Sequence, residues 1–197
     1  RPEYPTIVLQ VANVLENLQQ YDLALDSYSS VNPKNPNYLL AELGRAKNLA
    51  LLNRESESIE VLKSLSKSHY DNVVVHSSLG NMLRETDRDI EALEAYSTAI
   101  NLANLRNQPR WPIYFYRGIL YEKQKNFVKM ESDFREALKI SPNQPDVLNF
   151  LGYALVEQRK KLPEALQMIK MAVSEKPKSG YIIDSLGWVF YRLSKYE

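Results

Sequence analysis

The 197-residue sequence contains no cysteine and only six glycines. The absence of cysteine excludes disulfides, thiolate zinc sites, iron–sulfur clusters and cysteine nucleophiles. It does not indicate a compartment, because cytosolic and periplasmic proteins can both lack cysteine. Glycine is scarce and no Asn-Gly or Asp-Gly pair occurs, so the sequence carries no hairpin signal and no indication of β-strands.

The sequence also lacks an excess of either charge and any long apolar run. Its 25 lysines and arginines nearly balance 24 aspartates and glutamates, which leaves a formal net charge of +1. This balance argues against a protein that grips phosphate backbones, because such proteins usually carry a clear cationic excess. The longest apolar run is far below the roughly 18 residues of a membrane span, so we expect no membrane insertion. With 44% hydrophobic and 25% charged residues, the composition is that of a folded globular chain.

The two ends of the sequence are typical of a piece of a longer protein. The chain begins at Arg1 rather than at a methionine, and residues 192–197 stop in the middle of a helical pattern. We therefore interpret the chain as a fragment. Its compartment stays open, because a targeting signal can lie in the missing parts.

Internal repeats are the strongest signal in the sequence. Residues 149–155 have a counterpart in residues 184–190, 35 residues later, and residues 78–83 and 117–121 belong to the same series. Downstream of each complete copy, a small or short residue is followed four and seven residues later by larger apolar or small residues. Steps of four and three place such a trio on one face of a helix. The trios are Ala24, Tyr28 and Val31; Ser58, Leu62 and Leu65; Ala92, Tyr96 and Ala99; Met130, Phe134 and Ala137; and Ala165, Ile169 and Ala172.

Aligning these two patterns divides the chain into units of two amphipathic helices. Four units have 34 residues and one has 35, with a four-residue insertion at 107–110. Prolines stand where four of the helices should begin, where their missing N–H costs nothing. The predicted repeats are 5–38, 39–72, 73–106, 111–144 and 145–179, followed by a half repeat at 180–197; the prolines are Pro5, Pro112, Pro145 and Pro163.

This unit resembles the tetratricopeptide repeat over nearly the whole chain. The resemblance implies an all-α, right-handed superhelical solenoid of antiparallel helix pairs, with about five and a half repeats in a single domain, 1–197. Three positions depart from the family pattern: Tyr70 and Asn104 replace the closing proline, and Met130 stands where the family prefers alanine. The matching residues are Ala12, Ala46, Gly80, Gly118, Gly152 and Gly187 for the small residue of the first helix, and Pro36, Pro142 and Pro177 for the closing proline.

Motifs that carry chemistry are missing from the sequence. It contains no Gly-x-Ser-x-Gly, no Gly-x-x-x-x-Gly-Lys, no His-Glu-x-x-His and no Gly-x-Gly-x-x-Gly. We expect His69 near the end of a second helix and His76 packed in the next first helix, both in structural roles. The sequence therefore predicts a protein that is not an enzyme, with no catalytic residue, no cofactor and no metal.

The resemblance instead implies a protein–protein interaction scaffold whose partner lies along a concave groove lined by the first helices. It places polar side chains in the N-terminal half of that groove and aromatic or apolar ones in the C-terminal half, where aromatics are enriched at binding hot spots. Each of the residues in the C-terminal half has the alternative of packing between adjacent first helices. The predicted partner-binding residues are Asn13, Lys47, Asn81 and Arg84, then Phe115, Ile119, Tyr153, Tyr181, Trp188 and Tyr191.

Two other functions stay open, although the scaffold is favoured. The helix at about 180–195 lacks a second helix to pair with, so Ile183, Leu186 and Phe190 should be exposed. The chain can then form a homo-oligomer through residues 180–197, or its end can fray. Single-stranded RNA, which related helical hairpins bind, is disfavoured because lysines and arginines alternate with acidic residues in every repeat.

The stretch 181–193 is similar to uncharacterised proteobacterial tetratricopeptide repeat proteins, many of them exported to the cell envelope. This similarity favours a bacterial source and leans toward the periplasm, with the cytoplasm as the alternative. The sequence does not identify the protein or peptide partner.

Overall fold

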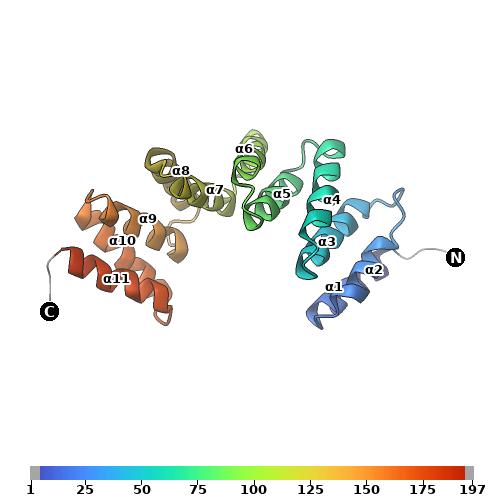
Figure 1. Ribbon diagram of the computed structural model, residues 1–197, viewed down its shortest axis with the longest axis horizontal. Helices are drawn as coiled ribbons and strands as arrows, with labels where there is room; N and C mark the ends of the chain where they lie inside the picture. Colours follow the sequence, from blue (N-terminus) through green and yellow to red (C-terminus); the bar gives the residue numbers. More distant parts are fainter. Residues whose placement is uncertain (1–4, 194–197) are drawn as a thin grey trace. The chain divides into compact units, whose positions relative to one another are not determined.

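A computed structural model describes residues 5–193, with side chains from Ile7 onward, and this range is all-α (Figure 1). Residues 5–193 form eleven helices and no strand, as the repeat pattern predicts. The helices are α1 (Pro5–Asn17), α2 (Tyr21–Ser29), α3 (Tyr38–Leu51), α4 (Glu55–Ser68), α5 (Val73–Glu85), α6 (Asp89–Leu105), α7 (Trp111–Lys123), α8 (Phe127–Ile140), α9 (Pro145–Glu157), α10 (Leu162–Glu175) and α11 (Gly180–Arg192).

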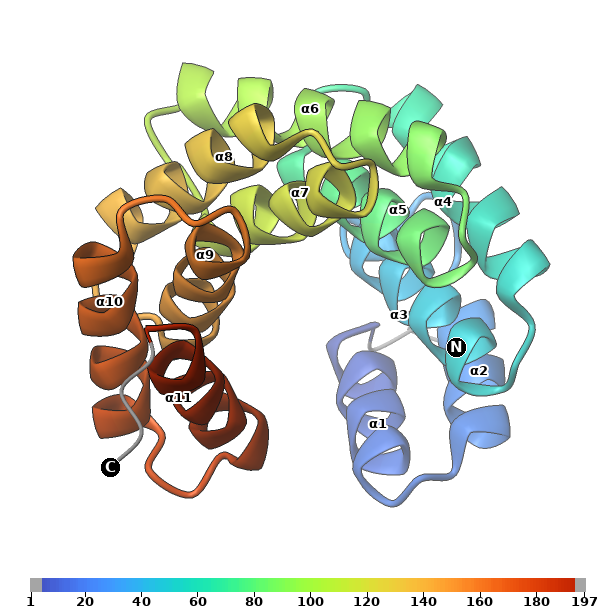
Figure 2. The ribbon, with the colours of Figure 1, turned by 60° about the vertical axis from the view of Figure 1, so that its left-hand side comes forward.

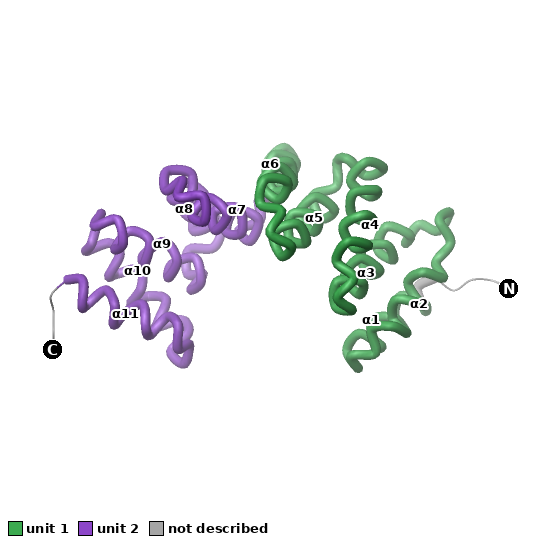
Figure 3. The backbone as a smooth tube through the Cα atoms, viewed as in Figure 1, with its two compact units in different colours: residues 1–108 green, residues 109–197 purple. Residues whose placement is uncertain are grey.

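The helices group into two compact units, residues 1–108 and 109–197 (Figure 3). Unit 1 holds α1 to α6 and unit 2 holds α7 to α11. The boundary falls inside the insertion at 107–110. In both units each helix packs on its neighbours in the chain, so the contacts are local, as in other helical repeats. Each predicted repeat contains one antiparallel helix pair, and the half repeat contains α11.

Small residues let the two helices of a pair approach closely. A Cβ added to Gly80 in α5 would lie 2.7 Å from the Tyr96 ring, and one added to Gly118 in α7 would lie 2.5 Å from the Phe134 ring. The space that a side chain would fill is thus already occupied by the large residue of the second helix. Gly187 in α11 has nothing within 4 Å of such a Cβ, and α11 is the last helix among the described residues.

Two residues after the end of the first helix of every complete repeat stands a residue in the left-handed conformation, and none of these residues is glycine. After each, a backbone N–H bonds a carbonyl five residues earlier, for example from Arg88 to Leu83 at 2.8 Å. This is the Schellman arrangement, which satisfies carbonyls that the helix end leaves open. The left-handed residues are Gln19 (φ 58°), Asn53 (56°), Asp87 (57°), Lys125 (57°) and Arg159 (53°).

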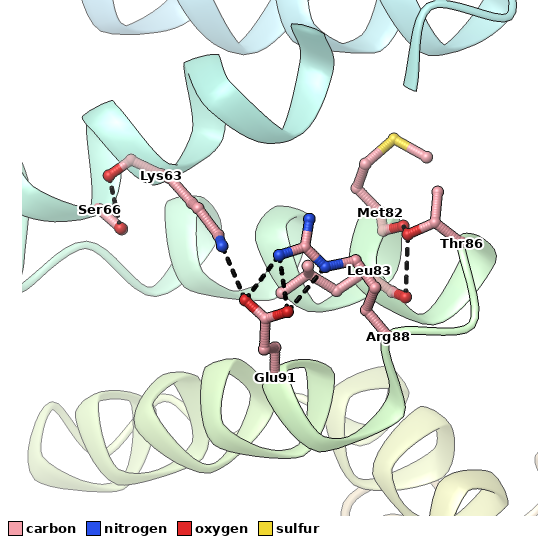
Figure 4. A network of polar contacts seen from close by, with 7 residues as sticks. All are labelled: Lys63, Ser66, Met82, Leu83, Thr86, Arg88 and Glu91. Atoms are coloured by element: carbon pink, nitrogen blue, oxygen red, sulfur yellow. Dashed lines mark hydrogen bonds and ion pairs between the residues drawn. The ribbon is translucent and has the colours of Figure 1, made fainter. Parts of the chain in front are cut away.

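Polar ties between second helices reinforce the stacking in unit 1 (Figure 4). Lys63 of α4 donates to Glu91 of α6 at 2.7 Å, and Arg88 donates to the same carboxylate through two nitrogens at 2.7 and 2.9 Å. The hydrogen bonds from Lys63 and Arg88 lower the pKa of Glu91 below its ordinary value. Because the group is solvent-exposed, its main effect is to fix register rather than to add stability.

A buried ion pair takes the place of apolar packing in unit 2. Arg117 of α7 donates to both carboxylate oxygens of Asp133 in α8, each at 2.8 Å. The Asp133 side chain is 5% exposed, and its burial raises the pKa of the carboxyl despite the guanidinium beside it. The pair joins the two helices of one hairpin.

Among the described residues, no helix is long and apolar enough to cross a lipid bilayer.

Candidate functional site

Unit 1 carries a groove with a volume of about 670 Å³. Its lining comes mainly from the first helices α1, α3 and α5, with Tyr28, Ser58 and Leu62 contributed by the second helices α2 and α4. First helices line it because their partner helices cover the opposite side of each hairpin. All of its lining residues belong to unit 1.

Two asparagines line this groove in equivalent positions, and each is held by a tyrosine. The Tyr28 hydroxyl donates to Asn13 Oδ1 at 3.2 Å, and the Tyr96 hydroxyl donates to Asn81 Oδ1 at 2.8 Å. Burial, together with the nearby Glu16 carboxylate, raises the pKa of Tyr28 to about 12, so this hydroxyl keeps its proton. Because each amide oxygen is engaged by a hydroxyl, each amide nitrogen is left to donate elsewhere.

A charged cluster connects α1 to α3 at the same groove. Lys47 donates to Glu16, and Asn48 donates to the second Glu16 oxygen at 2.6 Å. Burial raises the pKa of Glu16, but the hydrogen bonds from Lys47 and Asn48 act in the opposite direction and leave it below its ordinary value. Glu16 thus stays ionised, and the Lys47 ammonium is neutralised on one side while remaining exposed.

The remaining wall of the groove is apolar. Leu40 and Leu51 of α3 are 58% and 44% exposed and both line it. Arg84 is not a lining residue; its guanidinium lies 3.2 Å from Glu85, which is one. The groove therefore combines amide donors, opposite charges and aliphatic surface.

Of the residues predicted in unit 2, Phe115 lies in the core. Its ring is 7% exposed and meets Phe150 edge-on at 5.4 Å and Phe134 at 5.8 Å between centroids. Phe115 thus packs between neighbouring helices, which is the alternative to partner binding, and its ring offers a partner little surface. Ile119 is half-buried.

The other predicted aromatics stay accessible, and two of the four donate to acidic residues. The Tyr181 hydroxyl donates to Asp146, and the Trp188 indole donates to Glu157 at 2.6 Å. The Trp188 ring stacks on Tyr191, with centroids 5.3 Å apart and planes at 23°. Tyr153, Tyr181 and Tyr191 are exposed and Trp188 is half-buried. These residues form an aromatic surface on α9 and α11.

The end of unit 2 agrees in part with the predicted exposure. Ile183 is 46% exposed, whereas Leu186 and Phe190 are half-buried. Residues 194–197, the last of the half repeat, lie outside the described residues.

The two histidines have local partners. His69 ends α4 with its ring beside the Ser68 hydroxyl, and His76 Nε2 lies 2.9 Å from the Tyr70 carbonyl oxygen. Within residues 5–193, no three side chains of His, Asp or Glu gather where they could hold a metal ion.

Comparison with known proteins agrees with this architecture. A model of the tetratricopeptide repeat matches residues 112–144, nearly the same bounds as the predicted fourth repeat. TPR repeat-containing protein PA4667 of Pseudomonas aeruginosa is 28% identical over 174 residues, which cover 87% of this chain and 28% of that protein. The chain is a tetratricopeptide repeat protein.

Other tetratricopeptide repeat proteins match it over most of its length. Human tetratricopeptide repeat protein 13 is 26% identical over 173 residues, 85% of this chain and 19% of that protein. The chain thus spans less than a third of either curated relative. The structure of PilW, described as a type IV pilus biogenesis factor, superposes with a TM-score of 0.80 at 22% identity, covering 99% of this chain and 88% of that one. At that identity the likeness shows the fold.

Sequence reasoning missed several features of the site. The Tyr–Asn pairs were detectable, because both tyrosines follow their asparagine by 15 residues. The Glu16 cluster and the burial of Phe115 depend on how neighbouring repeats pack, for which the repeat pattern holds no separate signal.

Proposed function

We propose that this chain is a non-catalytic scaffold that binds an extended segment of a partner protein in the groove of unit 1. The tetratricopeptide repeat fold generally serves as a scaffold for protein–protein interaction. One solved relative, YrrB, is described as having an unusual peptide-binding site; it superposes with a TM-score of 0.68 at 16% identity, over 90% of this chain and 89% of its own.

The observation that carries this proposal is the pair of oriented asparagines. Tyr28 and Tyr96 occupy the amide oxygens of Asn13 and Asn81, so the Nδ2 groups are the donors left at the groove. An extended peptide presents backbone carbonyls that accept such bonds. Two fixed donors, one in the first repeat and one in the third, would bind the peptide backbone whatever its side chains are.

The apolar and charged residues beside them would supply selectivity. Leu40 and Leu51 expose aliphatic surface that alternate side chains of an extended segment can cover. Glu85 is 55% exposed in its side chain and lines the groove. A segment with apolar residues and a cationic side chain near Glu85 fits this arrangement best.

The test begins with selection of binding peptides from a random 12-residue library on the intact 197-residue chain. We expect the Asn13→Ala/Asn81→Ala variant to bind the selected peptides at least about tenfold more weakly in fluorescence polarisation, because two hydrogen bonds are lost. Asn101→Ala/Asn143→Ala is the matched control, since both asparagines are exposed and outside the groove. Equal affinity of the groove variant and wild type would refute the proposal.

The aromatic surface of unit 2 is a second candidate for partner binding. Its support is the accessible stack of Trp188 on Tyr191, with Tyr153 exposed on α9. The Tyr153→Ala/Trp188→Ala variant should bind peptides of this surface more weakly. Its affinity for peptides of the unit 1 groove should not change.

Self-association through α11 is the remaining alternative, favoured by the exposed Ile183 and the open space beside Gly187. Sedimentation equilibrium over a hundredfold concentration range tests it. A chain that stays monomeric over this range excludes self-association. An oligomer whose mass is the same for the Ile183→Asp variant excludes this surface as its interface.

A further inference from the structure

Helix α1 is apolar on two faces, and only one of them is packed. Val8, Leu9 and Leu15 lie against the core formed by Ala12, Ala24 and Tyr28. On another face Ile7, Val11 and Val14, together with Leu18 just after the helix, are 46–62% exposed. Leu23 of α2 is also exposed. We call these five residues the α1 face. A helix that is apolar on more than one face is usually covered on each of them.

The other first helices show what covers this face. In the four first helices that follow another repeat of the same unit, the equivalents of Ile7 are Ala41 in α3, Val75 in α5, Val147 in α9 and Ile182 in α11, and all four are 0% exposed. In each case the first helix packs on the second helix of the preceding repeat: α3 on α2, α5 on α4, α9 on α8 and α11 on α10.

The same contrast holds one turn further on. Val14 is 56% exposed, whereas its equivalents in the same four helices, Asn48, Met82, Ala154 and Val189, are at most 6% exposed. Figure 2 shows α1 at one end of unit 1, with α2 and α3 beside it. The α1 face is therefore the stacking surface of the repeat, and no helix of residues 5–193 covers it.

Helix α11 carries the face most similar to it in residue type and spacing. Ile182, Leu186, Val189 and Leu193 match Ile7, Val11, Val14 and Leu18 position by position. They pack on α10, whose Ala172 shares a buried cluster with Ile182 and Leu148, and Met168 and Val173 of α10 pack against that cluster.

From this match we propose that the α1 face binds an amphipathic α-helix with the pattern of α10, with apolar or small residues at the spacing of Met168, Ala172 and Val173. The face carries five aliphatic side chains and no charge, so the contact surface of the bound helix must be apolar as well. This site is separate from the groove of unit 1, whose lining does not include any residue of the α1 face.

The probe is a synthetic peptide of residues 160–178, which contains α10. A 14-residue helix is marginal alone, so a hydrocarbon staple joins positions 167 and 171, both exposed in α10. We expect the peptide to bind the intact chain and to slow hydrogen exchange in α1. Ile7→Asp/Val14→Asp should weaken binding at least about tenfold, since each carboxylate would be buried without a partner.

Two controls make the result specific. Ile90→Asp/Val128→Asp adds the same two charges at exposed positions of α6 and α8 and should leave the affinity unchanged. A peptide with Met168→Asp/Val173→Asp should not bind. Were the Ile7→Asp/Val14→Asp variant to misfold by circular dichroism, hydrogen exchange of the wild-type α1 with and without peptide would decide.

Three results would overturn the proposal. One is the absence of peptide binding or of α1 protection in the wild-type chain. Another is equal affinity of the two peptides. The third is self-association of the chain that Ile7→Asp/Val14→Asp abolishes, because a second copy, and not a helix of the α10 pattern, would then occupy the face.

Discussion

Units 1 and 2 are built from the same helical hairpin but fill its centre differently. In unit 1, two of the three hairpins place a tyrosine beside the small residue, and its hydroxyl reaches an asparagine on the first helix. In unit 2, Phe134 and Ile169 take that place, and Ile119 and Tyr153 stand where the asparagines would be. The units thus differ at two linked positions. In these two hairpins of unit 1, the large residue of the second helix carries a hydroxyl and the first helix carries an amide; in unit 2 the large residue carries no hydroxyl, and the first helix carries an apolar or aromatic side chain.

Removing the central ring should have the largest effect in either unit. Phe134 is fully buried against Phe115 and Phe150, and Tyr96 is fully buried against Gly80. We expect Phe134→Ala and Tyr96→Ala each to lower the free energy of unfolding by about 3–5 kcal/mol. Urea denaturation measures both. A loss below about 1 kcal/mol would contradict the packing described for that unit.

Adding a hydroxyl to the central ring of unit 2 tests whether the hydroxyl and the amide belong together. Phe134→Tyr places a hydroxyl near Ile119, which cannot accept a hydrogen bond, and should cost about 1–3 kcal/mol. Adding Ile119→Asn rebuilds the arrangement of unit 1 and should recover part of that loss. Additive effects in the double-mutant cycle would show that the hydroxyl and the amide do not interact in this setting.

The reverse exchange should be milder. Tyr96→Phe removes the donor to Asn81 while the half-buried amide stays accessible to water, so we expect a loss of about 0.5–1.5 kcal/mol. The amide of Asn81 would also become free to turn. Selected peptides should therefore bind more weakly to this variant. An unchanged peptide affinity would show that the Tyr96 hydroxyl does not contribute to binding.

The helix ends offer the smallest contrast between the units. The left-handed residues after the first helices are Gln19, Asn53 and Asp87 in unit 1 but Lys125 and Arg159 in unit 2. Asparagine and aspartate tolerate this conformation better than lysine. Lys125→Gly should raise the free energy of unfolding by about 0.5–1 kcal/mol, and Asn53→Gly should raise it less. Thermal unfolding of both variants tests this difference. A larger gain in stability for Asn53→Gly than for Lys125→Gly would contradict it.

The fold follows from the sequence because its signals are periodic. Steps of four and three placed the helix pairs, and Pro112, Pro145 and Pro163 lie at the first turns of α7, α9 and α10 as predicted. The left-handed helix ends carry no glycine, so the usual marker of a helix stop is missing there.

The sequence predicts the site less completely than the fold. The repeat position of Phe115 points to the groove, yet its ring is buried against Phe134 and Phe150, and contacts with two aromatic rings of other helices are not readable from a repeat position. Glu16 is anchored by Lys47 and Asn48 from the next repeat, a contact 31 or 32 residues away in sequence. Asn13, Lys47 and Asn81 do line the groove of unit 1.

Side-chain NMR tests the central claim most directly, which is that the oriented amides of unit 1 hold the partner. A selected peptide would be titrated into chain labelled with nitrogen-15, and the side-chain amide signals of Asn13 and Asn81 would be followed together with the Trp188 indole signal. We predict that both asparagine signals shift with saturation while the indole signal stays in place. Shifts at Trp188 with the two asparagine amides unmoved would contradict the account.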